Sequence, residues 1–296
     1  MHKTVLLHES VDALNLSNGS VVVDCTLGAG GHTEEVCKRF GSKVKIIGLD
    51  LDQDAINRSE KRLEGIGCNT TFHLSNFRDF DNILETLDLK EVDGFLLDLG
   101  FSSYQIEDSG RGFSFKRDEP LSMTLKREVT ENEFTAEMIV NNWSEESIAN
   151  ILYGYGNEQF SRRIAREIVL SREKMPIKTT TDLVSIIERA VPFFYTKGRI
   201  HPATKSFQAL RIAVNDELGA LEEFLEKGFS HLKSEGRMAV ISFHSLEDRI
   251  VKNFFKKKKE EGEAIMITKK PIIPGDEELK ENPRSRSAKL RTLQKI

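Results

Sequence analysis

The segment Val21–Thr33 combines a short apolar run, an acidic residue and a glycine-rich turn. Val21–Val23 is β-branched throughout, which is typical of a buried strand, and Asp24 follows it. The turn then contains Gly28, Gly30 and Gly31, and because glycine has no Cβ, backbone N–H groups in such a turn can approach a ligand closely. Thr33 stands where a G-x-G-x-x-G dinucleotide fingerprint would have its third glycine, so the spacing argues against a nicotinamide dinucleotide.

The turn instead resembles the loop with which Rossmann-like methyltransferases bind S-adenosylmethionine, in which an acidic residue precedes Gly-x-Gly. Asp50 ends the next apolar run, 22 residues beyond Gly28, where a carboxylate can accept both hydroxyls of a ribose. Phe77 follows the third expected strand and can either lie against an adenine ring or pack in the core.

A second run, from Asp98 to Gln105, places a carboxylate and two hydroxyls at the mouth of an apolar strand. A positively charged sulfonium would be stabilised beside Asp98, and Ser102 and Ser103 can orient a second substrate. Capping of a turn would explain the serines but not the acid. His244 ends a later strand, where it can act in the same crevice or, as a lone histidine more often does, make a structural hydrogen bond.

Strand and helix patterns alternate over roughly the first hundred residues, which favours an α/β fold with a doubly wound parallel sheet. Ligands of such sheets bind beyond the carboxyl ends of the strands, and Asp24, Asp50 and Asp98 all fall there. The elements expected in this part are Val21–Val23, Thr33–Phe40, Val44–Leu49, Gln53–Leu63, Thr71–Leu74 and Phe95–Leu97.

Amphipathic helices replace this alternation over residues 107–199, which we interpret as a helical insertion of domain size for RNA recognition. The α/β domain is then discontinuous, with residues 1–106 and 200–296. Ser144 and Thr181 are expected helix N-caps. The later pattern predicts one long helix over Thr204–Leu232, a strand over Met238–Phe243, a helix over Leu246–Lys258, a strand over Ala264–Lys269 and a mobile tail from Pro271.

Composition indicates a globular protein of the cytoplasm with no membrane segment and no metal site. Apolar residues make up 39% of the 296 residues and charged residues 30%. The net charge of −4 gives no global attraction to nucleic acid, so local basic clusters would have to supply it. The three cysteines, Cys25, Cys37 and Cys68, have no zinc spacing and suit a reducing compartment.

Taken together, these motifs resemble those of the bacterial methyltransferases that modify the exocyclic N4 of a cytidine in small-subunit (16S) ribosomal RNA, the ribosomal RNA small subunit methyltransferase H family. The resemblance implies S-adenosylmethionine as cofactor. It implies contacts in regions that the residue spacing also indicated, at Gly30, Gly31, Asp50, Phe77 and Asp98. It further implies contacts at His32 and Gln105, which the spacing did not indicate. The matching segments are His2–Leu7, Thr26–His32, Asp98–Ser103, Arg111–Phe115, His201–Thr204, Phe207–Ile212, Phe243–Arg249 and Asn282–Arg291.

The chain departs from the family at two places. The family usually reads Pro-Leu-Asp-Met-Arg-Met where this chain has Pro120-Leu-Ser-Met-Thr-Leu125, and Tyr104 replaces the usual proline before Gln105. Both departures lie where RNA is expected to enter, so they concern substrate contact rather than the cofactor.

The expected partner is small-subunit ribosomal RNA or the assembled small subunit, and a homodimer is possible. Six basic residues are candidates for phosphate contacts, each with the alternative of an ordinary surface charge: Arg111, Arg199, Lys205, Arg211, Arg284 and Arg286. Three other functions stay open: an amino-methyltransferase acting on DNA or protein, an NAD-dependent oxidoreductase, and a non-catalytic RNA-binding relative.

Overall fold

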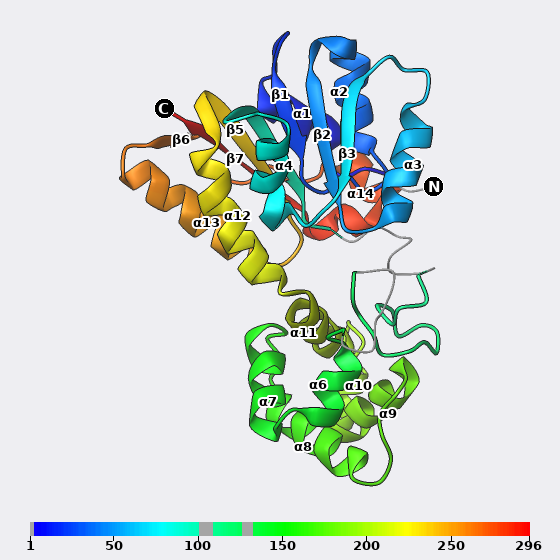
Figure 1. Ribbon diagram of the computed structural model, residues 1–296. Coiled ribbons are helices and arrows are strands. Elements are labelled where there is room, and N and C mark those ends of the chain that lie inside the picture. Colours follow the sequence, from blue (N-terminus) through cyan, green and yellow to red (C-terminus); the bar gives the residue numbers. More distant parts are fainter. Residues whose placement is uncertain (1–2, 101–108, 126–132) are drawn as a thin grey trace. The chain divides into compact units, whose positions relative to one another are not determined.

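The computed structural model describes residues 3–100, 109–125 and 133–296 (Figure 1). The expected Ser102, Ser103 and Gln105 lie outside the described residues. The chain forms two compact units, one from residues 1–100 with 218–296 and the other from residues 101–217.

The first unit contains a seven-stranded sheet in the order β3-β2-β1-β4-β5-β7-β6. Strands β1 to β5 are parallel to one another, whereas β7 is antiparallel to both β5 and β6. The carboxyl ends of β1, β2 and β4 therefore share one edge, and the predicted Rossmann-like α/β fold is confirmed. The strands are β1 Val21–Asp24, β2 Lys45–Asp50, β3 Asn69–Leu74, β4 Val92–Asp98, β5 Leu232–Ser242, β6 Ala264–Met266 and β7 Lys289–Lys295.

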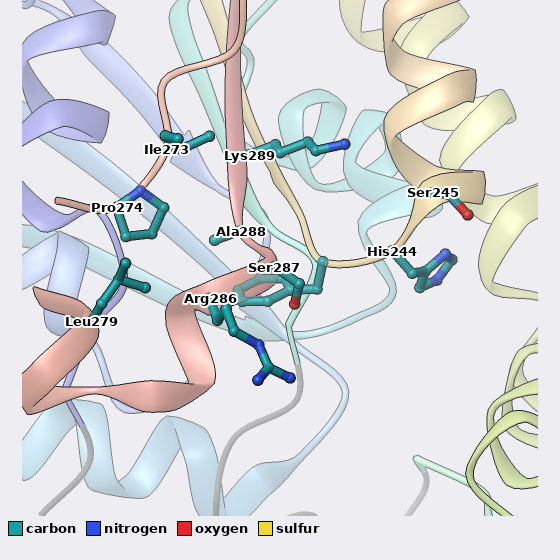
Figure 2. A pocket seen from close by; sticks show the side chains of 10 residues that line it. His244, Ser245, Ile273, Pro274, Leu279, Arg286, Ser287, Ala288 and Lys289 are labelled. Carbon is teal, nitrogen blue, oxygen red and sulfur yellow. The ribbon is translucent and has the colours of Figure 1, made fainter. Parts of the chain in front are cut away.

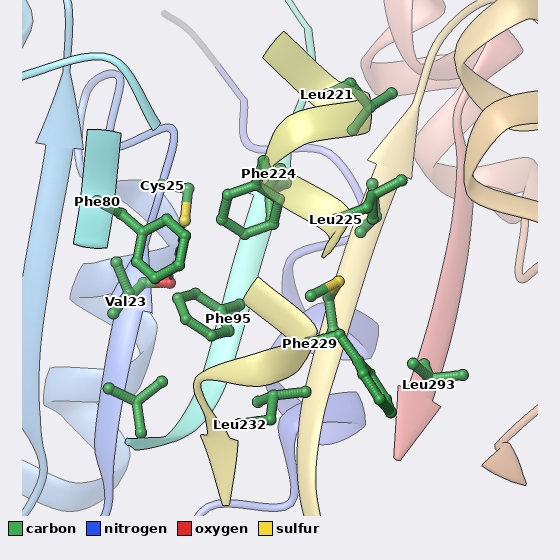
Figure 3. Close-up of a cluster of buried hydrophobic side chains, with 14 of the residues drawn as sticks. Val23, Cys25, Phe80, Phe95, Leu221, Phe224, Leu225, Phe229, Leu232 and Leu293 are labelled. Carbon is green, nitrogen blue, oxygen red and sulfur yellow. Dashed lines mark hydrogen bonds between the residues drawn. The ribbon is translucent and has the colours of Figure 1, made fainter. Parts of the chain in front are cut away.

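Helices cover both faces of this sheet, because consecutive strand residues point to opposite sides. Val23 and Ile47 belong to one apolar cluster, whereas their neighbours Val22 and Ile46 belong to another. On the first face, Phe80 meets Phe95 and Phe224 edge to face at centroid distances of 4.9 and 5.3 Å (Figure 3). The helices are α1 Leu7–Leu14, α2 Gly31–Phe40, α3 Gln53–Leu63, α4 Phe80–Thr86, α12 Glu217–Ser230, α13 Ser245–Glu260 and α14 Asp276–Glu281.

The second unit contains helices and irregular segments, with no named strand among its described residues, and it has its own apolar core. Ser144 caps α7 as expected, by accepting a hydrogen bond from the Ser147 N–H at 3.1 Å. The N-cap of α9 is Thr179 rather than the expected Thr181, and it forms a capping box with Asp182. The helices are α6 Ala136–Asn142, α7 Glu145–Gly154, α8 Ser161–Arg172, α9 Thr180–Ala190, α10 Phe193–Thr196 and α11 Thr204–Asn215.

The single long helix predicted over Thr204–Leu232 is wrong. Asp216 adopts a left-handed conformation, with φ 46°, and divides the segment into α11 and α12. Phe207 and Leu210 of α11 are buried in the helical core, so residues 200–217 belong to that unit rather than to the sheet. Apolar spacing continues across the break, which is why periodicity alone did not reveal it.

The tail from Pro271 is ordered, contrary to the prediction of a mobile segment. Its strand β7 lies between β5 and β6, and Leu290 and Leu293 are fully buried there. The side chain of Arg291 is 9% exposed and donates from Nε to Asp248 at 2.8 Å. This ion pair makes burial of a basic residue within the sheet possible.

Cys37 and Cys68 form a disulfide, although the sequence predicted that the three cysteines suit a reducing compartment. The two residues are 31 positions apart, yet their Cα atoms lie 5.4 Å apart because the end of α2 approaches the start of β3. Cys25 is free and buried. Among the helices of the described ranges, none combines the length and the apolar character that crossing a membrane requires.

Candidate active site

The three glycines after β1 have different roles. A Cβ built on Gly28 would meet nothing closer than the Thr26 carbonyl oxygen at 3.8 Å, whereas one on Gly30 would lie 2.8 Å from Ser59 Oγ. One on Gly31 would overlap Thr4 Oγ1 at 1.8 Å. Gly30 and Gly31 therefore allow close packing of the turn, and Gly28, with φ 55°, leaves an open backbone surface that a ligand can approach.

Asp50 is bound directly to this turn. Its Oδ2 accepts the Gly28 N–H at 2.8 Å, and its Oδ1 accepts the Asp52 N–H at 2.9 Å. Burial raises the pKa of the Asp50 carboxyl, while these two hydrogen bonds favour its ionised form. The structure thus brings together two residues that the sequence predicted to contact the same cofactor, with Asp50 at its ribose.

Asp24 and Asp98 lie at the ends of adjacent strands and are connected through Thr26. The Asp98 N–H donates to Thr26 Oγ1 at 2.6 Å, and the Thr26 N–H donates to Asp24 Oδ1 at 3.3 Å. Asp24 Oδ2 also accepts from Thr33 Oγ1 at 2.7 Å. Burial raises the pKa of Asp24 to about 6 in spite of these hydrogen bonds.

Asp98 is the most unusual acid of this edge. Its Oδ1 is buried and has no hydrogen-bond partner among the residues that the structure describes. Burial raises the pKa of Asp98 to about 7, and the negative charges of Asp24 and Glu247 add to this effect. A buried carboxylate oxygen of this kind requires a donor or a cation to be stable in its ionised form.

The predicted cofactor contacts at His32 and Phe77 have structural partners. His32 is buried, and its Nε2 lies 3.1 Å from the Val5 carbonyl oxygen. Phe77 precedes α4 and packs edge to face on Phe224 at a centroid distance of 5.7 Å, which matches the alternative of core packing. The cofactor role of both residues stays a prediction.

His244 is the N-cap of α13. Its Nδ1 accepts the Glu247 N–H at 3.4 Å, while Glu247 Oε2 accepts the N–H groups of Phe243 and His244 at 2.8 and 3.1 Å. These contacts form a capping box and match the structural alternative that the sequence left open. A catalytic role for His244 stays a prediction.

A cavity of about 280 Å³ opens beside His244. Figure 2 shows apolar side chains, Ile273, Pro274 and Leu279, on one side of it and His244, Ser245 and Lys289 on the other. The predicted phosphate contact Arg286 also lines it. The cavity adjoins the Asp98 strand end, because the Phe243 ring on its wall lies against Gly100.

Three of the candidate phosphate contacts are buried or half-buried and make hydrogen bonds within their own unit, and the other three are exposed. Arg111 is buried and donates to the Leu125 carbonyl at 2.6 Å, Lys205 donates to the Asn157 carbonyl at 3.0 Å, and Arg211 binds both Glu217 oxygens at 2.9 Å. Arg199, Arg284 and Arg286 are exposed.

Sequence reasoning missed the exposed pair Phe193 and Phe194, although two adjacent phenylalanines after Pro192 were a visible signal.

The segment that departs from the family is packed inside the helical unit. Leu121 and Met123 are fully buried, and Asn215 holds the segment by accepting the Leu125 N–H at 2.9 Å and donating to the Met123 carbonyl at 2.8 Å. The changed residues therefore belong to the framework of this unit.

Comparison with known proteins places these features in context. A family model described as the MraW methylase family matches residues 1–296. Two curated relatives named Ribosomal RNA small subunit methyltransferase H, from Clostridium botulinum strains 657 and Loch Maree, are each 46% identical over 311 aligned positions, covering 100% of this chain and 99% of theirs. A solved rRNA methylase from Streptococcus thermophilus aligns with a TM-score of 0.48 and 13% identity, over 100% of this chain and 99% of that one.

Proposed function

The chain belongs to the MraW methylase family, and from this membership we propose that it transfers a methyl group from S-adenosylmethionine to the exocyclic N4 of a cytidine in small-subunit (16S) ribosomal RNA. The names of its full-length relatives support the substrate. The observation that carries the chemistry is the buried oxygen of Asp98, which has no hydrogen-bond partner among the described residues, at the edge that also holds the glycine turn.

The residues at this edge fit the cofactor. The open backbone of Gly28 can approach the ligand, Asp50 retains lone pairs for the ribose hydroxyls, and Asp98 offers a carboxylate to a cationic group. When bound, S-adenosylmethionine supplies a methyl group activated by a positively charged sulfur. Asp98 would balance that charge, and Gly28 with Asp50 would hold the adenosine end.

The cytosine amine is the difficult reactant, because its lone pair is delocalised into the ring. Holding this nitrogen in line with the carbon–sulfur bond can supply about 7–11 kcal/mol in well-aligned systems. As the nitrogen–carbon bond forms and the carbon–sulfur bond breaks, the nitrogen becomes positive and then loses a proton to an acceptor or to water. We assign the electrostatic stabilisation of this amine to Asp98, with Ser102 and Ser103 orienting it.

We assign RNA recognition to the helical insertion, residues 107–199, and we propose small-subunit ribosomal RNA in the cytoplasm, free or in the assembled subunit, as the substrate. A homodimer is the alternative to a monomer. The target base would leave any stack before reaching the crevice, because its amine must approach the reacting carbon.

Two experiments test the function. Mass-spectrometric mapping of ribosomal RNA from cells with and without the gene should show one N4-methylated cytidine that depends on it. Purified protein should also transfer tritiated methyl groups to small subunits or their RNA. Transfer to DNA or to protein alone would overturn the substrate, and binding of NAD without binding of S-adenosylmethionine would overturn the reaction.

The role of Asp98 has its own test. Asp98→Ala should abolish methyl transfer while the circular dichroism spectrum and melting temperature stay close to those of the parent protein. Asp276→Asn, which removes a charge from the exposed start of α14, is the control and should retain full activity. Near-normal turnover by Asp98→Ala would refute the assignment.

A further inference from the structure

Two adjacent phenylalanines are exposed on the helical unit. Phe193 and Phe194, in α10, are 76% and 69% exposed. Large apolar side chains side by side on a surface mark sites of interaction more often than isolated ones. This pair plays no part in the core of its own unit.

The backbone that carries the pair is held in place by the next residue. Tyr195 turns inward, and its hydroxyl donates to Glu158 Oε2 at 2.7 Å, while its ring meets Phe160 edge to face at a centroid distance of 5.0 Å. Glu158 is fully buried. The Phe194 ring also approaches Phe160, at a centroid distance of 6.3 Å. The two exposed rings therefore project from a fixed turn.

One cation lies over an exposed ring, and two others lie on neighbouring residues. Lys197 Nζ lies 5.2 Å from the centre of the Phe193 ring, and the Arg163 guanidinium lies 5.8 Å from that of Phe160. Arg199 follows in the same exposed segment. Within the described ranges, none of these three cations is paired with a carboxylate. Since the whole chain has a net charge of −4, this local excess of positive charge is notable.

We propose that this aromatic–basic surface, defined by Phe193, Phe194, Lys197, Arg163 and Arg199, binds a single-stranded segment of the substrate RNA. The phenyl rings would stack on unpaired bases, and the cations would neutralise neighbouring phosphates. The proposal rests on the proposed function and adds where the RNA binds. An apolar protein partner would use the rings but would not need unpaired cations beside them, so the charge favours RNA.

The test compares two double variants of the full-length protein with one control. Phe193→Ala/Phe194→Ala should weaken binding of protein-free small-subunit RNA by about tenfold to a hundredfold, because each stacked base contributes substantially. Phe193→Leu/Phe194→Leu should weaken it nearly as much, since leucine is apolar but cannot stack. Tyr153→Ala removes an aromatic ring that is 66% exposed on α7 and should change binding by less than about twofold.

Three outcomes would overturn the proposal. Affinity for protein-free RNA that is retained in the leucine variant would show that the rings do not stack on bases, and a loss seen only with assembled subunits would indicate a ribosomal protein. A shift from dimer to monomer in sedimentation of the protein alone would assign the surface to a second copy of the chain. The affinity for S-adenosylmethionine should be unchanged in every variant. Failure of the proposed function is separate, because it would appear as an absence of N4-methylcytidine with the parent protein.

Discussion

The protonation state of Asp98 should control how strongly the protein prefers S-adenosylmethionine to its demethylated product. The product, S-adenosylhomocysteine, has an uncharged sulfur but is otherwise the same ligand. A carboxylate beside the sulfur therefore favours the methyl donor only when it is ionised. The ratio of the two affinities reports this effect, and the same ratio in Asp98→Asn controls for titration of the ligands' own amino groups.

The size of the effect follows from the pKa of about 7 for Asp98. With that pKa, the ionised fraction rises from about one in eleven at pH 6 to about ten in eleven at pH 8. The preference for S-adenosylmethionine should thus increase by up to about tenfold over this interval. Binding of the donor near pH 7 should also release protons, since a nearby positive charge lowers the pKa of a carboxyl.

Isothermal titration calorimetry at several pH values, in buffers of different ionisation enthalpy, measures both quantities. Asp98→Asn should remove the pH dependence of the affinity ratio, and Asp276→Asn should leave it intact. A ratio that stays constant between pH 6 and pH 8 in the parent protein would refute the reasoning, provided that NMR places the pKa of Asp98 near 7.

Three further changes test other parts of the structure. Gly28→Ala should lose most of the affinity for the cofactor, measured by calorimetry. Gly41→Ala, at a residue with a similar φ of 58° and open space around it, should keep that affinity and lose only about 1–2 kcal/mol of stability to backbone strain, measured by melting curves. Asp248→Asn should lower the free energy of unfolding by about 3 kcal/mol, because it leaves Arg291 buried without its partner; a change below about 0.5 kcal/mol in urea titration would contradict this. Leu293→Ala should cost about 2–5 kcal/mol in the same assay, as expected for a core strand and not for a mobile tail.

The local motifs of the sequence were sufficient to predict the sheet edge and its acids. A β-branched run, an acid and a glycine turn are neighbours along the chain, so their geometry depends little on distant residues. For the same reason Gln53–Leu63 was predicted with the bounds that α3 has in the structure. The approach of Asp50 to Gly28 followed from the general rule that parallel strands end at one edge.

Features that depend on distant contacts were not visible in the sequence. The segment that forms β7 mixes basic and apolar residues and reads as a polar tail, and it becomes a strand because β5 and β6 pair with it and Asp248 neutralises Arg291. The break at Asp216 leaves the apolar spacing unchanged, so only the packing of α11 in the helical core shows it.

Sequence alone therefore determined the fold class, the cofactor turn and the candidate acids, since each is written in a few consecutive residues. The tertiary structure decided which glycine stays open, that His244 caps a helix, that Cys37 meets Cys68 and that Phe193 and Phe194 stay outside the core. The physical reason is that burial, charge pairing and exposure depend on which distant residues come into contact, and a residue's neighbours in sequence do not specify these contacts.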